Sequence, residues 1–210
     1  MDGPGGAGKS TVAKRLAQSI GYRYLDSGAM YRAVAYAYSR QRPVDLDAFL
    51  AGLSLEFRFD GKVAVSLDGQ DITERIRTPE VSLLASSLSQ DRRVRTYLTR
   101  MQREIGESGG IVVEGRDTGS AVFPGAEVKF YLDADIAERA RRRHRELAAG
   151  GRGGDLERVR EEMERRDRAD SERDIAPLVC PEGALYVDTT GKTIEEVVEV
   201  LENHVRRASK

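Results

Sequence analysis

Residues 3–10 read Gly3-Pro4-Gly5-Gly6-Ala7-Gly8-Lys9-Ser10, and this stretch decides the fold that we expect. It matches the pattern G-x-x-x-x-G-K-[ST] in full, and residues 8–20 continue it with apolar residues at helical spacing. Glycines let successive backbone N–H groups converge on a phosphate, and the N-terminus of the next helix adds a favourable potential. The sequence therefore predicts a phosphate-binding loop that leads directly into a helix.

Each position of this loop has an expected task in binding ATP. Lys9 is expected to reach the β and γ phosphates, and the Ser10 hydroxyl is the candidate ligand for Mg²⁺. The candidate ATP-binding residues are Gly3, Gly5, Gly6, Ala7, Gly8, Lys9, Ser10 and Thr11. Such a loop normally follows a buried strand, but only Met1 and Asp2 precede it here. Either the first residues are missing from the sequence as given, or the strand is reduced to a stub.

Patterns typical of strands and of helices alternate along the rest of the chain. We expect strands over residues 22–26, 109–114, 127–132 and 184–188. We expect helices over residues 8–20, 27–40, 81–105, 135–168 and 193–207. Ser27 is the expected N-cap of the second helix, and the third is expected to break near Gln90 and Asp91. This alternation predicts an α/β fold of the P-loop NTPase type, a doubly wound parallel sheet with helices on both faces.

Two segments depart from this alternation. Residues 53–73 hold two Asp-Gly pairs, Asp60-Gly61 and Asp68-Gly69, between runs of alternating or β-branched residues, which predicts a small antiparallel insert. Residues 139–170 are very charged and are split by glycines at 150–154, which predicts a helical hairpin that acts as a lid. With 210 residues, we expect one domain over residues 1–210.

The composition argues against several classes of protein. Charged residues make up 33% of the chain, but the net charge of -1 is unlike that of a polybasic nucleic-acid-binding protein. No apolar stretch reaches the roughly 18 residues of a membrane span, and no leader is visible, so we expect a cytoplasmic protein without a membrane partner. Cys180 is the one cysteine of the sequence, which excludes an internal disulfide.

The loop predicts triphosphate binding but leaves the acceptor of the phosphoryl group open. The sequence has no N-K-x-D stretch, which argues against a GTPase and favours a kinase of small molecules or nucleotides. Polar clusters follow two predicted strands at residues 26–32 and 114–119, and a third cluster lies at 166–173. Ligands of doubly wound sheets bind at the C-terminal ends of the strands, so these clusters form the candidate acceptor site.

The chain resembles the cytidylate kinase family in stretches that span nearly its whole length. Besides the D-G-P-x-G-x-G-K-S loop, they are Y-L-D-S-G-A-M-Y-R from Tyr24, a three-stranded insert, E-G-R-D-x-G-x-x-V-F-P from Glu114, and R-D-x-x-D-x-x-R-x-x-A-P-L from Arg166. The resemblance implies transfer of the γ-phosphoryl group of ATP to CMP or dCMP, giving ADP and CDP or dCDP. Small-molecule nucleotides are then the partners.

The resemblance also implies a role for each residue on the acceptor side. The residues implied to hold the acceptor phosphate are Ser27, Arg32, Arg116, Arg166 and Arg173. Those implied to read cytosine are Ser86, Arg95 and Asp117, and the one implied to hold the ribose hydroxyls is Asp170. The catalytic residues implied in this way are Lys9, Arg32, Arg116, Arg166 and Arg173.

The chemistry explains why no nucleophilic or general-base side chain is needed. A phosphate monoester has a second pKa of about 6, so the attacking oxygen is already ionised at neutral pH. The barrier is the repulsion between two polyanions, which Lys9, Mg²⁺ and a ring of arginines are expected to neutralise.

From the residues alone, plainer interpretations of the acceptor side stay open. Arg32 could be a solvated helix residue, and Arg116 and Asp117 could pair with each other or cap a helix. Asp170 and Arg173 could form an ordinary salt bridge within a helix. Without the resemblance, Ser86 and Arg95 look like ordinary helix residues.

Two other functions are also compatible with the sequence. The first is a kinase for another small acceptor such as UMP. The second is a nucleotide-dependent binding module in which the insert or the arginine-rich stretch contacts RNA or a partner. The balanced charge favours an enzyme that binds no nucleic acid, and we expect a monomer.

Overall fold

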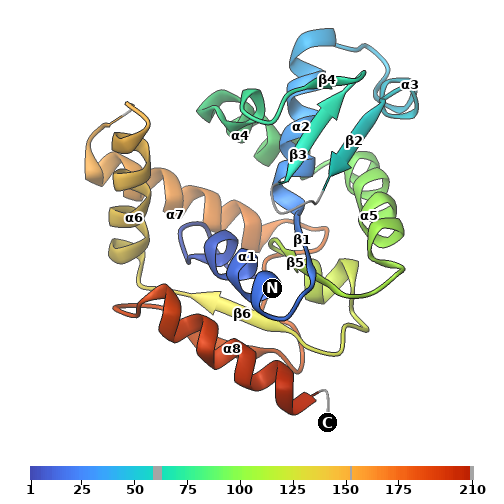
Figure 1. Cartoon of the computed structure of the whole chain (residues 1–210). Coiled ribbons are helices and arrows are strands. Elements are labelled where there is room, and N and C mark those ends of the chain that lie inside the picture. The colour runs from blue at the N-terminus through green and yellow to red at the C-terminus, as the bar shows by residue number, and fades with distance from the viewer. Residues whose placement is uncertain (59–62, 152, 209–210) are drawn as a thin grey trace. The chain divides into compact units, whose positions relative to one another are not determined.

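A computed structural model describes residues 1–58, 63–151 and 153–208 of the chain. The chain divides into two compact units, the first made of Met1–Ile20 and Glu114–Lys210 and the second of Gly21–Val113. Figure 1 shows the elements of both units along the chain. No helix in the described part of the chain is long and apolar enough to cross a membrane.

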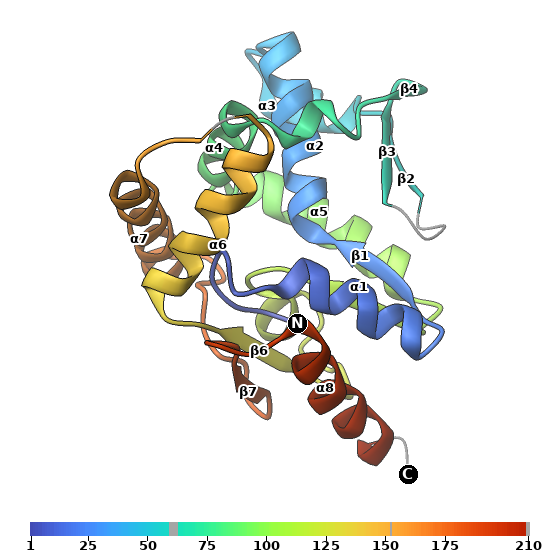
Figure 2. The same ribbon diagram turned by 60° about the vertical axis from the view of Figure 1, so that its left-hand side comes forward.

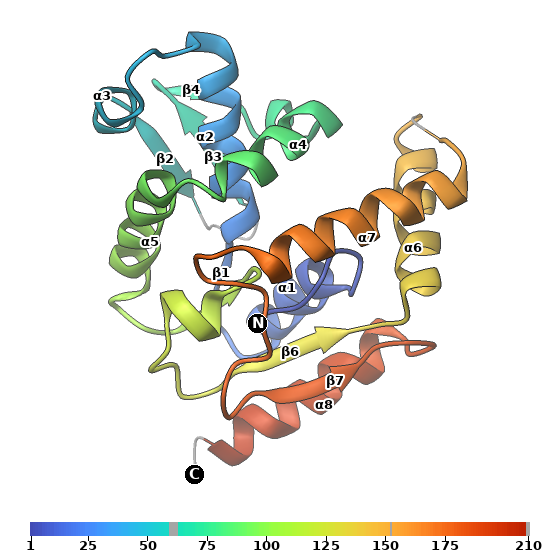
Figure 3. The ribbon, with the colours of Figure 1, turned by 180° about the vertical axis from the view of Figure 1, so that it is seen from behind.

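The first unit holds the phosphate loop and the helix that follows it, α1 (Lys9–Ser19). Helix α1 buries its apolar face and packs against the C-terminal helix α8 (Ile194–Ala208), as Figure 2 shows. Strands β6 (Phe130–Asp133) and β7 (Leu185–Asp188) lie side by side (Figure 3). They run parallel, with Phe130 opposite Leu185. Helices α6 (Ile136–Ala149) and α7 (Leu156–Glu172) pack together as a hairpin, and the single π-helical turn η2 (Thr118–Val122) precedes β6.

Met1 and Asp2 are hydrogen-bonded to the chain segments on both sides of them in this unit. The Asp2 N–H donates to the Phe130 carbonyl at 2.8 Å, and the Leu132 N–H donates to the Asp2 carbonyl at 2.9 Å. On the other side, the Gly115 N–H donates to the Met1 carbonyl at 3.0 Å. The stub is therefore hydrogen-bonded on both sides, although it amounts to an isolated parallel bridge and not a full strand.

The stub also buries a charged group. The Met1 ammonium donates to Thr118 Oγ1 at 3.2 Å, and burial lowers its pKa below the usual value. We expect that adding about five apolar residues before Met1 raises the melting temperature, because a peptide group replaces the buried ammonium and further ladder hydrogen bonds form. We also expect tighter ATP binding, since the strand would anchor the loop. Calorimetric melting and ATP titration of the extended chain test this, and an unchanged melting temperature would contradict it.

The second unit contains the insert and the helices around it. Strand β1 (Arg23–Asp26) pairs with β5 (Ile111–Glu114), the last residue of which already belongs to the first unit. Strands β2 (Leu55–Arg58), β3 (Ala64–Leu67) and β4 (Gln70–Asp71) form an antiparallel sheet. The helices are α2 (Ser27–Gln41), α3 (Leu46–Ala51), η1 (Arg75–Arg77), α4 (Pro79–Leu88) and α5 (Arg92–Gly106).

Most of the expected elements are confirmed. The predicted insert is a three-stranded antiparallel sheet, and Asp68 and Gly69 both have positive φ at the turn between β3 and β4. The other predicted turn, Asp60-Gly61, lies outside the described residues. The expected break between two helices falls at residues 89–91, between α4 and α5.

Some expectations need correction or refinement. Ser27 is not the N-cap of α2, because the Asp26 carboxylate accepts the Ala29 N–H at 2.8 Å and takes that place. Helices α3, η1 and η2 were not among the elements expected from the sequence. The described strands form parallel and antiparallel groups of two or three, so the structure shows a mixed α/β fold with the small antiparallel sheet.

Candidate functional site

The phosphate loop lies between the Asp2 bridge and α1, and its first glycine is fixed by packing. A Cβ on Gly3 would lie 1.9 Å from the Leu132 carbonyl oxygen, and the φ of Gly3 is +141°. A side chain at this position would therefore clash with β6, so the close passage of the loop across the strand needs glycine. Gly8 also has a positive φ, +88°, at the point where the loop enters α1.

Lys9 is buried at the start of α1 and folds back onto the loop. Its Nζ donates to the Pro4 carbonyl at 2.6 Å. Burial lowers the pKa of Lys9 to about 7, and the positive charges of Arg116 and Arg166 act in the same direction. Two guanidinium groups and the amine of Lys9 thus gather at the loop, an arrangement that favours an anion with several negative charges.

The lowered pKa of Lys9 gives a testable pH dependence. At roughly pH 8 the amine of the free protein is mostly neutral, and bound triphosphate raises its pKa, so ATP binding should take up a proton. We expect calorimetric titrations in buffers of different ionisation enthalpy to show this uptake. Lys9→Arg, which stays charged at every accessible pH, should bind ATP without it. Equal uptake by both proteins would show that another group titrates.

The lowered pKa of Lys9 also has a consequence for stability. Between about pH 7 and the ordinary lysine value of about 10.4, the unfolded chain holds more protons than the folded one at this position. The contribution of Lys9 to stability therefore rises with pH across that window.

Ser10 lies beside a carboxylate that the sequence analysis did not single out. Its hydroxyl donates to Glu114 Oε1 at 2.6 Å, and Glu114 is buried at the end of β5. A hydroxyl and a carboxylate oxygen are hard oxygen donors, which is the chemistry that Mg²⁺ prefers. No group of three or more His, Cys, Asp or Glu suited to a metal is found among the described residues. Mg²⁺ in kinases is held by few protein ligands and by substrate phosphates, so the pair fits that ion.

The segment after β5 is fixed to the N-terminal stub. The wholly buried Asp2 carboxylate accepts the N–H groups of Thr118 and Gly119, each at 2.7 Å, and the Thr118 hydroxyl at 2.7 Å. The sequence analysis gave Asp2 no role. Through these bonds Asp2 holds the segment that contains Arg116 and Asp117 next to the phosphate loop.

The candidate acceptor residues of the first unit form a network of buried ion pairs. Arg116 Nε donates to Asp170 Oδ2 at 3.0 Å, and Arg173 Nη2 donates to Asp117 Oδ1 at 3.3 Å. Arg173 also lies 3.8 Å from Asp170, the helical spacing expected from the sequence. Arg116 lies against the loop, since a Cβ on Gly5 would be 3.5 Å from its Nη2.

The second unit places its candidates around the N-terminus of α2. Arg32 Nη2 donates to Asp26 Oδ2 at 3.0 Å, and the buried Nε of Arg32 has no hydrogen-bond partner among the described residues. Ser27 is buried in the first turn of the same helix. Arg32 is therefore not a solvated helix residue.

Arg95 and Ser86 are linked through Ser89 in this unit. Arg95 Nη1 donates to the Ser89 carbonyl at 3.1 Å, and the Ser89 hydroxyl donates to the Ser86 carbonyl at 2.7 Å. The Arg95 guanidinium lies 5.9 Å from the ring centroid of Tyr31, the residue before Arg32. Arg95 is buried, with an exposed fraction of 4%, which is unusual for an arginine without a functional or pairing role.

Each unit thus contains part of the set of site residues predicted from the sequence. The first brings together the loop residues with Arg116, Asp117, Arg166, Asp170 and Arg173, although Thr11 is exposed on α1. The second contains Ser27, Arg32, Ser86 and Arg95. The residues that sequence reasoning missed include Glu114, Asp2 and Tyr31, which lie within quoted motif stretches.

Comparison with known proteins gives consistent results. The family profile described as cytidylate kinase matches residues 1–207. A cytidylate kinase of Geobacter sulfurreducens is 47% identical over 212 residues, covering 98% of this chain and 91% of the relative. A cytidylate kinase of Syntrophotalea carbinolica is 48% identical, covering 95% of this chain and 87% of the relative, and one of Enterococcus faecalis is 43% identical, covering 99% and 94%.

Proposed function

The chain belongs to the cytidylate kinase family, and we propose that it transfers the γ-phosphoryl group of ATP to CMP or dCMP, giving ADP and CDP or dCDP. The observation that supports this most strongly is the gathering of Lys9, Arg116 and Arg166 at a complete phosphate loop in one unit. We propose that the fold is the doubly wound P-loop NTPase type, with α6 and α7 as its lid.

The proposed reaction needs charge neutralisation more than proton transfer. The acceptor phosphate is a dianion at neutral pH, and its oxygen attacks the γ-phosphorus of ATP while the bond to the β-γ bridging oxygen breaks. Lys9 neutralises charge on the donor phosphates, and Arg116 and Arg166 face the transferring group. Arg32 and Arg173 complete the set by holding the acceptor phosphate.

Mg²⁺ would be held by Ser10, with Glu114 orienting the hydroxyl and accepting from bound water. Mg²⁺ bound there would supply charge neutralisation at the phosphates of ATP.

Acceptor binding exchanges the partners of the buried ion pairs. In the structure, Asp170 and Asp117 hold the guanidinium groups of Arg116 and Arg173. A phosphate dianion is a stronger partner for a guanidinium than one carboxylate is, so the arginines turn to phosphate. The two carboxylates are then available for the ribose hydroxyls and for cytosine. Ser27, Ser86 and Arg95 contribute the remaining contacts to phosphate and base.

The proposed lid hairpin excludes water during the reaction. Water competes with CMP as an acceptor, so ATP bound in a site open to solvent would be hydrolysed. Helix α7 contains Arg166 and Asp170, so closure of this helix over the nucleotides would also complete the catalytic set.

One assay distinguishes the proposed function from its alternatives. ADP release from ATP is measured with each nucleoside monophosphate in turn. We expect turnover with CMP and dCMP that far exceeds turnover with UMP. Preference for UMP would indicate a kinase of another acceptor, and ATP binding without acceptor-dependent turnover would indicate a binding module.

We further propose that the protein acts as a monomer in the cytoplasm, with nucleotides as its partners and no nucleic acid or membrane partner. Light scattering after gel filtration, with and without nucleotides, tests the monomeric state. Retention of the protein on immobilised RNA at physiological salt would contradict the absence of a nucleic-acid partner.

A further inference from the structure

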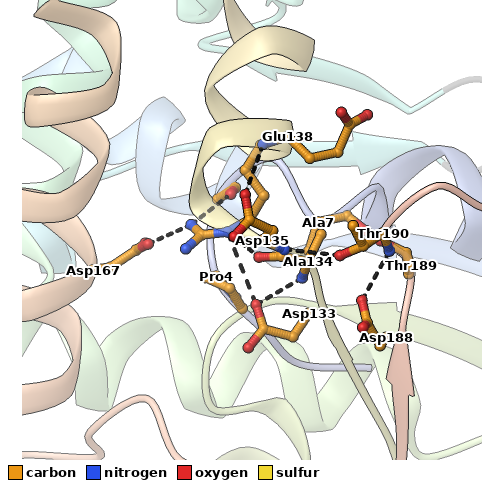
Figure 4. Close-up of polar contacts among 12 residues, drawn as sticks. Pro4, Ala7, Asp133, Ala134, Asp135, Glu138, Asp167, Asp188, Thr189 and Thr190 are labelled. Carbon is orange, nitrogen blue, oxygen red and sulfur yellow. Dashed lines mark hydrogen bonds and ion pairs between the residues drawn. The ribbon is translucent and has the colours of Figure 1, made fainter. Parts of the chain in front are cut away.

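Arg139, in the first turn of α6, is a buried arginine to which neither the sequence motifs nor the proposed reaction gives a role. Its Nε donates to the Ala134 carbonyl at 2.8 Å, and its Nη1 donates to the Gly5 carbonyl at 3.2 Å and to Asp167 Oδ2. Asp133 Oδ1 lies 3.8 Å from Nε. Figure 4 shows this meeting of Asp133, Ala134 and Asp167. One guanidinium therefore joins the phosphate loop, the end of β6 and helix α7.

The contact with Gly5 orients the phosphate loop. The peptide bond is planar and trans, so the Gly5 carbonyl and the Gly6 N–H point in opposite directions. Because Arg139 holds that carbonyl, it also sets the direction of the Gly6 N–H, one of the donors expected to bind phosphate. Gly6 packs closely beside it, since a Cβ there would lie 3.0 Å from Arg139 Cβ and 2.9 Å from Met163 Cε on α7.

The contact with Asp167 connects helix α7 to the phosphate loop through Arg139. Asp167 directly follows Arg166, whose positive charge already acts on Lys9. The side chain of Arg139 is 10% exposed and that of Asp167 is 18% exposed, so this pair is shielded from solvent. Two carboxylates, Asp133 and Asp167, balance the charge of Arg139. The contacts of Arg139 therefore connect parts of the protein to one another and do not leave its guanidinium to bind a phosphate.

We propose that Arg139 is a positioning residue that holds the phosphate loop and α7 in the geometry that transfer requires. This inference rests on the proposed kinase function. Arg139 acts through two hydrogen bonds. The bond to the Gly5 carbonyl orients the loop toward ATP, and the bond to the Asp167 carboxylate orients Arg166 toward the transferring group. Loss of the bond to Gly5 affects ATP binding, and loss of the bond to Asp167 affects the chemical step.

Two conservative variants separate the effects of these two hydrogen bonds. Arg139→Lys keeps the charge, but a single ammonium cannot reach Gly5, Ala134 and Asp167 together. We expect its kcat to fall about 10- to 100-fold and its KM for ATP to rise several-fold, because small misplacements of catalytic groups have large effects. Asp167→Asn keeps the shape and the Gly5 contact, so its kcat should fall while its KM for ATP stays near that of the wild type. In both variants the KM for CMP should change less than about twofold.

The matched control is Arg141→Ala on the same helix, where Arg141 is exposed and pairs with Glu138. It should have wild-type kinetics. Folded Arg139→Lys and Asp167→Asn proteins with wild-type kcat would overturn the inference, as would a change mainly in the KM for CMP. If Arg139→Lys does not fold, the kcat of Asp167→Asn decides alone. A wild-type protein without CMP-dependent turnover would instead refute the proposed function, which keeps the two failures distinct.

Discussion

Replacing Lys9 with methionine is expected to lower kcat by about 10²- to 10³-fold, the loss typical of removing one preorganised donor to transition-state charge. This corresponds to about 3 to 4 kcal/mol of transition-state stabilisation. The fold should persist, because methionine fills a similar volume at a buried position and removes an amine that burial disfavours in its charged form. Steady-state kinetics with ATP and CMP and a thermal melt of the same sample measure both effects.

The control for this prediction is Lys14→Met, a change of the same kind at an exposed position of α1. Its turnover should match that of the wild type. A folded Lys9→Met protein that keeps near wild-type kcat would contradict the proposed mechanism. An unfolded one would show that the bond to the Pro4 carbonyl matters more for stability than the burial of the amine does.

The helices could be predicted from the sequence because their apolar spacing is long and regular. Helix α1 buries Val12, Ala13, Leu16 and Ala17, the positions that the pattern indicated. Helix α3 was missed because six residues give too little periodicity, although Asp45 caps it through the N–H groups of Asp47 and Ala48. Neither η1 nor η2 has a comparable local signal, since three to five residues do not define a period.

The pairing of the acceptor-side charges could not be predicted. Arg116 and Asp117 are adjacent in sequence, and a local pair was one open interpretation. Instead Arg116 pairs with Asp170, 54 residues away, and Arg173 pairs with Asp117, 56 residues away. Residue types and spacing predict pairs within a helix, such as Asp170 with Arg173, but a pair across elements depends on how those elements pack.

The roles of Glu114 and Arg139 show the same limit. Glu114 ends a predicted strand two positions before Arg116, so its position near the candidate site could have been predicted. The hydrogen bond that it accepts from Ser10 could not. Arg139 looked like one of many arginines in a charged helix. Its burial alone separates it from exposed neighbours such as Arg141 and Arg145, and burial is a property of the folded chain.

Replacing Asp117 with alanine is expected to reduce turnover of CMP steeply and to bring the ratio of kcat/KM for CMP and UMP close to one. Cytosine offers the N4 amino group as a donor, whereas uracil presents O4 as an acceptor. In the proposed function, the carboxylate of Asp117 would accept from N4 and would repel O4. The guanidinium of Arg95 would donate to N3 and O2 of cytosine but would oppose N3–H of uracil. Sites that leave buried polar groups unpaired discriminate by about 10⁴ to 10⁵, so most of the preference for CMP depends on this contact.

Asp117 also holds Arg173 in the structure, and this second role needs its own control. Arg173 is proposed to bind the acceptor phosphate, which CMP and UMP share, so Arg173→Ala should lower kcat/KM for both substrates in the same proportion. Asp117→Ala should differ by changing the ratio, and kcat/KM measured for both nucleotides with both variants decides the matter. If Asp117→Ala also lowered kcat/KM for CMP and for UMP in the same proportion, Asp117 would serve only to orient Arg173. Cytosine would then be recognised by other groups.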